Sequence, residues 1–205
     1  IPFPEKNRSL KNVLHQQDVC RNGLNASSSE ANRGNASFRR DAPQRLVEKI
    51  AATGKFPARG VLDQDFPVAE QEELGRQVLE DLGFDLEAGR LDVAVHPFCS
   101  GTSRDDVRLT TRYSADWLPG SLFGTIHEAG HGLYEQGLPE DAVATPAGGS
   151  VSLGIHESQS RLWENMVGRS KAFSTHYLPR LKALFPTQLQ NVNLDEFYAA
   201  VNQVE

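Results

Sequence analysis

The sequence of 205 residues has only two cysteines, Cys20 and Cys99, and no excess of basic charge, since its formal net charge is -6. Two cysteines are too few for a disulfide framework, so we expect a reducing, cytoplasmic location. An acidic balance gives no support to nucleic-acid binding. The sequence also lacks an apolar run long enough to cross a membrane and shows no secretory signal. We therefore expect neither a nucleic-acid partner nor a membrane partner.

What remains is the composition of an ordinary globular protein, with 39% hydrophobic and 23% charged residues. Residues 1–40 differ from the rest because they are rich in Asn, Ser, Arg and Gly and hold seven basic against three acidic residues. Such a segment buries too little apolar area to offset the entropy of ordering, so it is predicted to be disordered. The remaining residues, 41–205, are predicted to form one ordered domain.

Helical signals dominate the ordered part. Apolar spacing and cap residues predict helices at about residues 41–54, 66–84, 119–136, 152–169, 171–185 and 194–205. The first would begin at a capping Asp41 and end at Gly54, and the second would end at Gly83. Pro179 is predicted to break or kink the helix that contains it.

Two segments switch to the period of a β-strand. In residues 90–98, Leu91, Val93 and Val95 alternate, and in residues 106–113 the residues from Val107 to Tyr113 alternate between apolar and polar faces. The linker "CSGTSRD" is short, polar and contains a glycine, so the two segments are predicted to pair as an antiparallel hairpin. The expected fold class is therefore mainly α with a small antiparallel β-hairpin or sheet.

The stretch "HEAGH", residues 127–131, places two histidines four positions apart inside a predicted helix. Residues i and i+4 lie one turn apart on the same face, so the imidazoles of His127 and His131 stand side by side. Glu128 points about 100° away, within reach of a metal-activated water but not as a ligand. This is the arrangement of zinc peptidases, in which the glutamate is the general base. The alternative is two histidines that share a helix face without a metal.

A catalytic zinc takes a third protein ligand and keeps one position open. The tetrapeptide "HESQ", which starts at His156, offers two candidates, because Glu157 and His156 are both suitable ligands. Adjacent helical residues point about 100° apart, so only one of them should coordinate. We favour Glu157 as the ligand and place His156 on the wall of the cleft. The set predicts one divalent metal, Zn²⁺ first and Co²⁺ as an alternative.

The other polar candidates each have a structural explanation. His96 could contact substrate or cap a strand end, and Arg108 and Arg112 share a strand face that could be solvated or could bind substrate. Arg161 follows Glu157 by one helical turn and most simply pairs with a nearby carboxylate.

Four motifs occur in order along the sequence: "HPF" at 96–98, "DVRLTTRY" at 106–113, "HEAGH" at 127–131 and "HESQSRLWEN" at 156–165. From about residue 43 to the end, the sequence resembles the M32 metallocarboxypeptidases, the carboxypeptidase Taq or thermostable carboxypeptidase group. HExxH alone is shared by many peptidase families, but its combination with "HESQSR" at this spacing is highly specific. Residues 41–205 are thus expected to form a partial M32-like catalytic domain.

The resemblance implies a helical, zincin-like peptidase with a small sheet beside a deep cleft, often a homodimer, that removes C-terminal residues from peptides with zinc or cobalt. It implies His127, His131 and Glu157 as ligands and Glu128 as the catalytic glutamate. Motif residues expected near the cleft, and thus candidates for peptide-substrate binding, are His96, Asp106, Arg108 and Arg112.

The sequence departs from the family in length, since its members are about twice as long. Two later motifs, of the types "IRxxAD" and "GxxQDxHW", are absent, and so is the long N-terminal helical region. We therefore expect a truncated member whose metal site is complete. The first functional hypothesis is a metal-dependent carboxypeptidase that uses a metal-activated water. The alternative is a catalytically inactive metal-binding relative, and a metalloendopeptidase is the third.

Overall fold

The computed structural model describes residues 45–46, 48–50, 52–53, 60–143 and 145–203. They fall in two parts of the chain, divided near residue 57, and each part is described by itself. In the first part, the described residues from 45 to 52 are helical, as predicted. The cap residues Asp41 and Gly54 and the segment 1–40, predicted to be disordered, lie outside the described residues.

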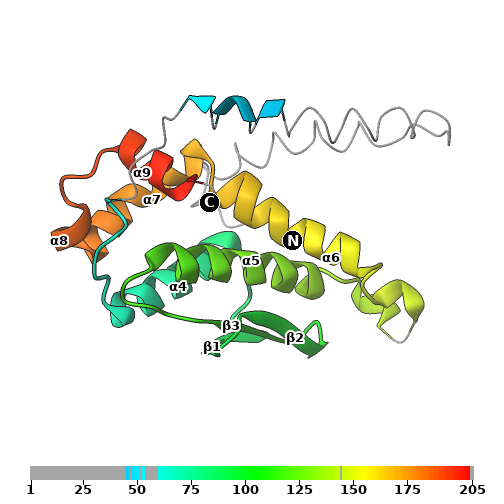
Figure 1. Ribbon diagram of the computed structural model, residues 1–205. Helices are drawn as coiled ribbons and strands as arrows, with labels where there is room; N and C mark the ends of the chain where they lie inside the picture. Colours follow the sequence, from blue (N-terminus) through cyan, green and yellow to red (C-terminus); the bar gives the residue numbers. More distant parts are fainter. Residues whose placement is uncertain (1–44, 47, 51, 54–59, 144, 204–205) are drawn as a thin grey trace. The chain divides into compact units, whose positions relative to one another are not determined.

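Helices make up most of the second part (Figure 1). They are α4 (Val68–Leu82), α5 (Leu118–Gln136), α6 (Leu153–Arg161), α7 (Lys171–Leu184), α8 (Pro186–Leu189) and α9 (Leu194–Val201). A small sheet consists of β1 (Gly89–Val93), β2 (Phe98–Ser103) and β3 (Asp106–Thr111). Two short 3-10 turns, Glu140–Ala142 and Pro146–Gly148, lie between α5 and α6. This architecture confirms a mainly helical fold with a small sheet.

The strand pairing differs from the predicted hairpin. β3 is the central strand; β1 pairs with it in parallel and β2 pairs with it antiparallel. The hairpin therefore joins β2 to β3, and the predicted partner of β3, residues 90–98, is instead β1 on its other side. Residues 99–105 were predicted to be a linker because most of β2 is polar and exposed, so it lacks the apolar alternation of a strand. A Cβ on Gly101 would lie 2.8 Å from the carbonyl oxygen of Asp106, so glycine permits the close approach at the irregular register there.

One face of β3 packs against α5, and the side chains on it are Val107, Leu109 and Thr111. Thr125 of α5 donates a hydrogen bond from its hydroxyl to that of Thr111 at 3.2 Å. A Cβ on Gly132 of α5 would lie 3.0 Å from Leu109 Cδ2, so this glycine lets the helix lie close to the strand. The sheet thus supports the helix that carries the "HEAGH" motif (Figure 1).

The predicted ends and faces of several helices are confirmed. Leu74, Val78 and Leu82 form the buried stripe of α4, which ends at Gly83 in the left-handed region with φ 88°. Of the break or kink predicted at Pro179, the break does not occur, because α7 continues through this residue. Pro179 and Thr175 are both exposed, so water can satisfy the Thr175 carbonyl that loses its donor.

The predicted helix 152–169 is continuous but changes type. α6 passes at Leu162 into a π-helical segment, Leu162–Gly168, in which the Arg169 N–H donates to the Glu164 carbonyl at 3.0 Å. A π-helix makes i→i+5 hydrogen bonds and is wider than an α-helix, so it turns its side chains differently from a continued α6. Glu164 lies in this segment.

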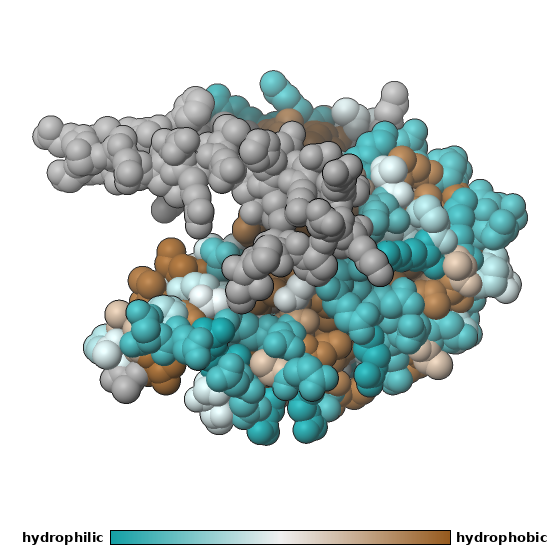
Figure 2. All heavy atoms as spheres, turned by 180° about the vertical axis from the view of Figure 1, so that it is seen from behind, coloured by the Kyte–Doolittle hydropathy of each residue, from teal (hydrophilic) through white to brown (hydrophobic). Residues whose placement is uncertain are grey.

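On the face drawn in Figure 2, hydrophobic residues are interspersed with hydrophilic ones. The largest exposed fractions among apolar side chains belong to Leu153, Val95, Val151, Met166 and Val93. No helix in the described part of the chain combines the length and apolar character needed to cross a membrane.

Candidate metal centre

His127 and His131 lie one turn apart on α5, with ring centroids 5.1 Å from each other. α5 is covered by the sheet on one side and by α6 on the other, so both imidazoles are largely enclosed, with 19% and 16% of their side-chain surface exposed. The helical period alone sets their spacing, which is why the sequence could predict it.

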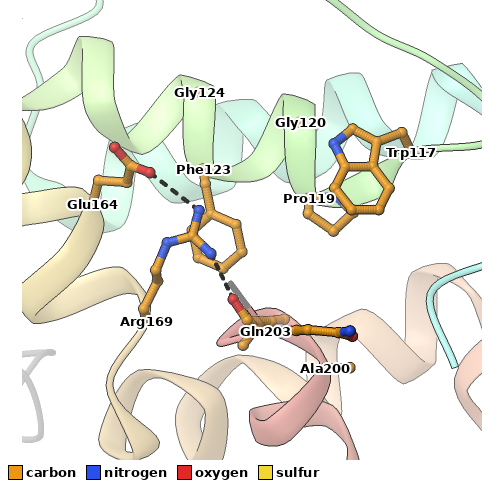
Figure 3. Close-up of a pocket in the computed structure, with 10 residues that line it drawn as sticks. Trp117, Pro119, Gly120, Phe123, Gly124, Glu164, Arg169, Ala200 and Gln203 are labelled. Carbon is orange, nitrogen blue, oxygen red and sulfur yellow. Dashed lines mark hydrogen bonds and ion pairs between the residues drawn. The ribbon is translucent and has the colours of Figure 1, made fainter. Parts of the chain in front are cut away.

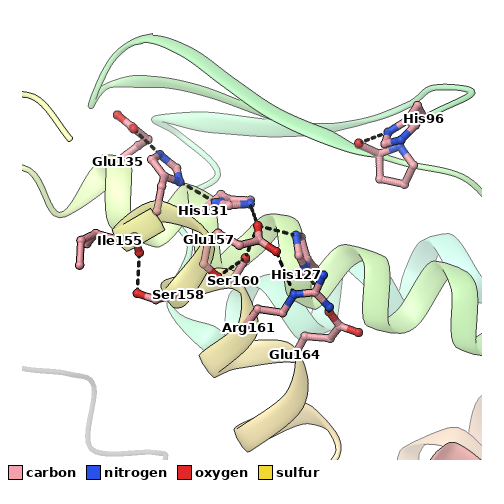
Figure 4. Close-up of polar contacts among 12 residues, drawn as sticks. His96, His127, His131, Glu135, Ile155, Glu157, Ser158, Ser160, Arg161 and Glu164 are labelled. Carbon is pink, nitrogen blue, oxygen red and sulfur yellow. Dashed lines mark hydrogen bonds and ion pairs between the residues drawn. The ribbon is translucent and has the colours of Figure 1, made fainter. Parts of the chain in front are cut away.

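α6 brings Glu157 to the two imidazoles (Figure 4). Its Oε2 atom lies 3.6 Å from His127 Nε2 and 3.4 Å from His131 Nε2. One ligand atom from each of the three residues can be chosen so that all lie within 4.8 Å of one another. The structure thus brings together the three side chains that the sequence singled out as ligands.

These separations fit a divalent metal. Two ligands bound at about 2.1 Å with a tetrahedral angle lie about 3.4 Å apart, which is close to both nitrogen–oxygen distances. Two imidazoles and one carboxylate are a donor set typical of catalytic zinc, which leaves a fourth position for water or substrate. The Glu157 side chain is 47% exposed, so the centre is open to solvent on that side. The same donor set accepts cobalt.

Both oxygens of the Glu157 carboxylate accept hydrogen bonds from neighbours on the same helix. Arg161 Nε donates to Glu157 Oε1 at 2.8 Å, as expected from the one-turn spacing, and Ser160 Oγ donates to Oε2 at 3.1 Å. Burial alone would raise the pKa of Glu157, but the hydrogen bonds from Arg161 and Ser160 lower it. The group therefore stays ionised, as a ligand must, and Oε2 faces the histidines.

Glu164 fixes the ring of His127. Its Oε2 atom lies 2.9 Å from His127 Nδ1, and its Oε1 atom accepts from Arg169 Nη2 at 3.1 Å. The hydrogen bond to Glu164 raises the pKa of His127. Burial would raise the pKa of Glu164, but its hydrogen bonds to His127 and Arg169 lower it. A charged carboxylate at Nδ1 keeps the proton on that nitrogen and leaves Nε2 free to accept a metal.

His131 is held through a second histidine. Its Nδ1 atom lies 2.5 Å from His156 Nδ1, and His156 Nε2 lies 2.6 Å from Glu135 Oε1. Burial, with His156 and His127 nearby, lowers the pKa of His131, so its imidazole is held neutral. His156 therefore touches a candidate ligand, while Glu157 is the residue of this pair that completes the donor cluster.

Glu128 is buried beside the donor cluster, with 6% of its surface exposed. Burial raises its pKa, His127 opposes this rise and Glu157 adds to it. A carboxylate with a raised pKa can take up and release a proton nearer to neutral pH. Cys99 of β2 lies on the same side; burial and then Glu128 and Glu135 raise its pKa to about 12.

The structure does not bring the other sequence candidates to the three donor atoms. His96 is exposed, and its Nδ1 atom lies 2.7 Å from the Pro97 carbonyl, apart from the cluster in Figure 4. Arg108 pairs with Asp106 on the face of β3 that points away from α5, with Nε 2.8 Å from Oδ1. Arg112 directly follows β3 and is exposed.

Sequence reasoning missed two carboxylates that hold the imidazoles. Glu164 lies seven residues after Glu157, two turns along the same helix, and Glu135 lies one turn after His131. Both spacings place a carboxylate on the metal-facing side and could have drawn attention to them. Their exact partners could not be read, because one depends on the π-helical segment and the other on contact between α5 and α6.

A pocket of about 240 Å³ borders the metal centre (Figure 3). Trp117 and Phe123 line it from the α5 side, and the Arg169 guanidinium lies 4.1 Å from the centre of the Phe123 ring. Glu164 lines the pocket and also holds His127, so one carboxylate connects the pocket to the candidate metal ligands.

Residues 34–205 match the family model described as carboxypeptidase Taq (M32) metallopeptidase. The chain belongs to this family. It is 48% identical to thermostable carboxypeptidase 1 of Thermus thermophilus over 160 residues, which cover 78% of this chain and 31% of that protein. It is 42% identical to carboxypeptidase 1 of Bacillus subtilis over 158 residues, which cover 77% and 32%.

The structure matches an M32 carboxypeptidase from Deinococcus radiodurans with a TM-score of 0.79 and 39% sequence identity. The match covers 87% of this chain and 36% of that one. The M32 chain therefore spans about a third of the length of the relatives that it matches. The family match, residues 34–205, includes α5 and α6, which carry the candidate metal centre.

Proposed function

We propose that this M32 chain carries the metal-binding core of a metallocarboxypeptidase that hydrolyses the C-terminal peptide bond of peptides. The observation that supports this most is the convergence of His127, His131 and Glu157 from two helices, with Glu157 Oε2 at 3.6 and 3.4 Å from the two Nε2 atoms. Glu128 follows His127 on α5 and is our candidate for the general base.

The donor set fits one divalent ion, Zn²⁺ first and Co²⁺ as the alternative. When bound, such an ion supplies Lewis acidity, which acidifies water and polarises a peptide carbonyl. Glu164 and Arg161 prepare the ligands for it, because one fixes the His127 ring and the other fixes the Glu157 carboxylate.

Glu128 would move the proton. Its carboxylate accepts a proton from the attacking water and returns it to the nitrogen of the leaving amino acid. Burial raises the pKa of Glu128, which makes it a stronger base for the first transfer than an ordinary carboxylate would be. Replacing this group by an amide removes the base without removing a ligand.

Exopeptidase action also needs a cation for the terminal carboxylate of the substrate, and arginine can bind both of its oxygens. Arg108 is already paired with Asp106, whereas Arg112 makes no ion pair within the described residues, so Arg112 is the more available of the two. His96 stays a further candidate, since it is exposed and lies near enough to Glu128 for its charge to lower the pKa of that carboxyl. A homodimer and a cytoplasmic location also stay predictions.

The test is release of the C-terminal amino acid from an N-blocked dipeptide, with Zn²⁺ or Co²⁺ added, for the wild type and Glu128→Gln. We expect hydrolysis by the wild type, and in Glu128→Gln a loss of about 100-fold or more with metal uptake retained. Metal uptake without hydrolysis by the wild type would favour an inactive metal-binding relative. Cleavage of a peptide whose C-terminus is amidated would favour an endopeptidase.

A further inference from the structure

His156 has no ring nitrogen left for a substrate. Its Nδ1 atom is engaged by His131 Nδ1 at 2.5 Å and its Nε2 atom by Glu135 Oε1 at 2.6 Å. The Tyr134 ring packs edge-on against it, with centroids 5.1 Å apart, and only 17% of its side chain is exposed. A histidine that contacts a peptide needs a free donor or acceptor, and this one has neither.

The two contacts determine which ring nitrogens carry protons along the chain of hydrogen bonds from His131 through His156 to Glu135. For His131 to accept a metal, Nε2 must carry a lone pair, so the ring proton is on Nδ1 and is donated to His156 Nδ1. His156 must then carry its own proton on Nε2, which it donates to the Glu135 carboxylate. The need for a lone pair on His131 Nε2 therefore fixes the tautomers of both histidines. The chain of hydrogen bonds ends on the Glu135 carboxylate, which only accepts.

The other ligand histidine offers an internal comparison. Glu164 contacts His127 Nδ1 directly at 2.9 Å. On the side of His131, the carboxylate of Glu135 reaches the ligand through His156. Each imidazole is thus tied to one carboxylate, and the two ties come from different elements: the π-helical segment for His127, and α5 with α6 for His131.

We propose that His156 and Glu135 are positioning residues that hold the His131 ring in the tautomer and orientation that present Nε2 to the donor cluster, and that His156 does not contact substrate. This inference rests on the metal site of the proposed function. Carboxylates that hydrogen-bond to ligand histidines typically change metal affinity by about 10- to 100-fold when they are removed.

The test measures the apparent Kd for Zn²⁺ by competition with a chromophoric chelator. We expect His156→Leu to weaken binding by about 10- to 100-fold and Glu135→Ala to weaken it by a smaller factor within that range. His156→Asn should restore most of the affinity, because its Oδ1 can still accept from His131 Nδ1. Glu140→Ala, which removes an exposed carboxylate that pairs with Arg104, should bind as the wild type does.

A double-mutant cycle shows whether Glu135 acts through its hydrogen bond to His156 or through long-range attraction between its charge and the metal. If Glu135 acts through His156, then Glu135→Ala adds no further loss in the His156→Leu background. Losses that multiply would show that Glu135 acts by long-range attraction, and they would overturn the proposal. An unchanged Kd in His156→Leu, with a raised KM for the blocked dipeptide, would overturn it in favour of a substrate contact.

Two controls distinguish loss of the proposed contacts from misfolding and from failure of the proposed function. Circular dichroism of each metal-free variant shows whether it folds, and if His156→Leu does not, His156→Asn and Glu135→Ala address the same path from either side. A wild-type chain that takes up no Zn²⁺ would contradict the proposed function itself. Wild-type uptake with unaffected variants would contradict only the role of His156 and Glu135.

Discussion

Gly130 of α5 lies against the backbone of Ser160 of α6. A Cβ atom on Gly130 would lie 2.6 Å from Ser160 Cα and 2.8 Å from the Gln159 carbonyl oxygen. Neither neighbour can rotate away, because both are backbone atoms. Gly130 directly precedes His131, and Ser160 follows Glu157 by less than one turn, so this contact sets the distance between ligands from the two helices.

Replacing Gly130 by Ala should therefore push α6 away from α5. We expect the free energy of unfolding to fall by about 1–3 kcal/mol, as for other overpacked sites, and the apparent affinity for Zn²⁺ to fall with it. Urea denaturation and chelator competition measure the two effects. Gly154→Ala on α6 is the matched control, since its Cβ would meet only Ser152 Oγ at 3.8 Å. Equal behaviour of the two variants would show that the helix contact does not position the ligands.

Arg161→Ala should weaken metal binding without much change in stability. Arg161 holds the Glu157 oxygen that faces away from the histidines, so its loss lets the carboxylate rotate. Its side chain is 57% exposed, and exposed ion pairs contribute about 0–1 kcal/mol to folding. We expect the Kd for Zn²⁺ to rise by about 10-fold and the thermal midpoint to stay close to that of the wild type. Lys171→Ala, which breaks the exposed pair with Asp195, is the control and should leave the Kd unchanged.

Much of the candidate site follows from local rules that a sequence shows directly. The spacing of His127 and His131 depends only on the helical period, and the position of Glu157 on the next long helix could be anticipated from its motif. The hydrogen bonds that hold the two ligand histidines could not, because they join residues 21 to 37 positions apart in the sequence. Such contacts depend on how α6 crosses α5 and where it becomes a π-helix.

In the fold, too, the sequence predicted the features that follow from local patterns and missed those that depend on tertiary contacts. Periodicity predicted α4, which buries one apolar stripe, and it also predicted α5, which is buried on two sides. It missed β2, whose side chains are nearly all exposed, and so it predicted a hairpin between residues 90–98 and β3, whereas β1 pairs with β3 in parallel and the hairpin joins β2 to β3. Pro179 shows the limit of a strong local rule, since an exposed helix face tolerates a proline that a buried one would not.

Tyr177→Phe tests a buried contact far from the metal centre. Tyr177 is 1% exposed, its hydroxyl donates to Asp81 Oδ2 at 2.8 Å, and Arg180 pairs with the same carboxylate. Hydrogen bonds to charged groups contribute about 1.5–3 kcal/mol, so we expect a loss of that size in the free energy of unfolding. Tyr113→Phe is the control, because the Tyr113 hydroxyl makes no hydrogen bond within the described residues, and it should change stability by less than about 0.5 kcal/mol. Equal losses in the two variants would refute this role for the Asp81 contact.

Cys99 should react slowly with iodoacetamide in the folded protein. Burial, with Glu128 and Glu135 nearby, raises its pKa to about 12, so at pH 8 only about one thiol in ten thousand would be thiolate, against about a quarter for an unperturbed cysteine. Mass spectrometry of the peptide that contains Cys99 measures the rate, and the chain in guanidinium chloride is the control. Equal rates in the folded and unfolded chains would show that the raised pKa is wrong.

The raised pKa of Cys99 also predicts how the stability of the protein changes with pH. Because the folded thiol keeps its proton to higher pH than the unfolded thiol, the contribution of Cys99 is fully present below about pH 8.5 and is lost as the pH rises toward 12. We therefore expect Cys99→Ser to lose less stability than the wild type between pH 8.5 and 10.5 in urea denaturation. Parallel pH profiles for the two proteins would contradict this linkage.

The central claim is that His127, His131 and Glu157 together bind one divalent ion, and metal stoichiometry tests it most directly. After saturation with Zn²⁺ and removal of excess metal, we expect one zinc per chain in the wild type and in Glu128→Gln. We expect far less than one in His131→Ala and Glu157→Ala, each shown by circular dichroism to be folded. A full equivalent of zinc in both ligand variants, or none in the wild type, would contradict the account.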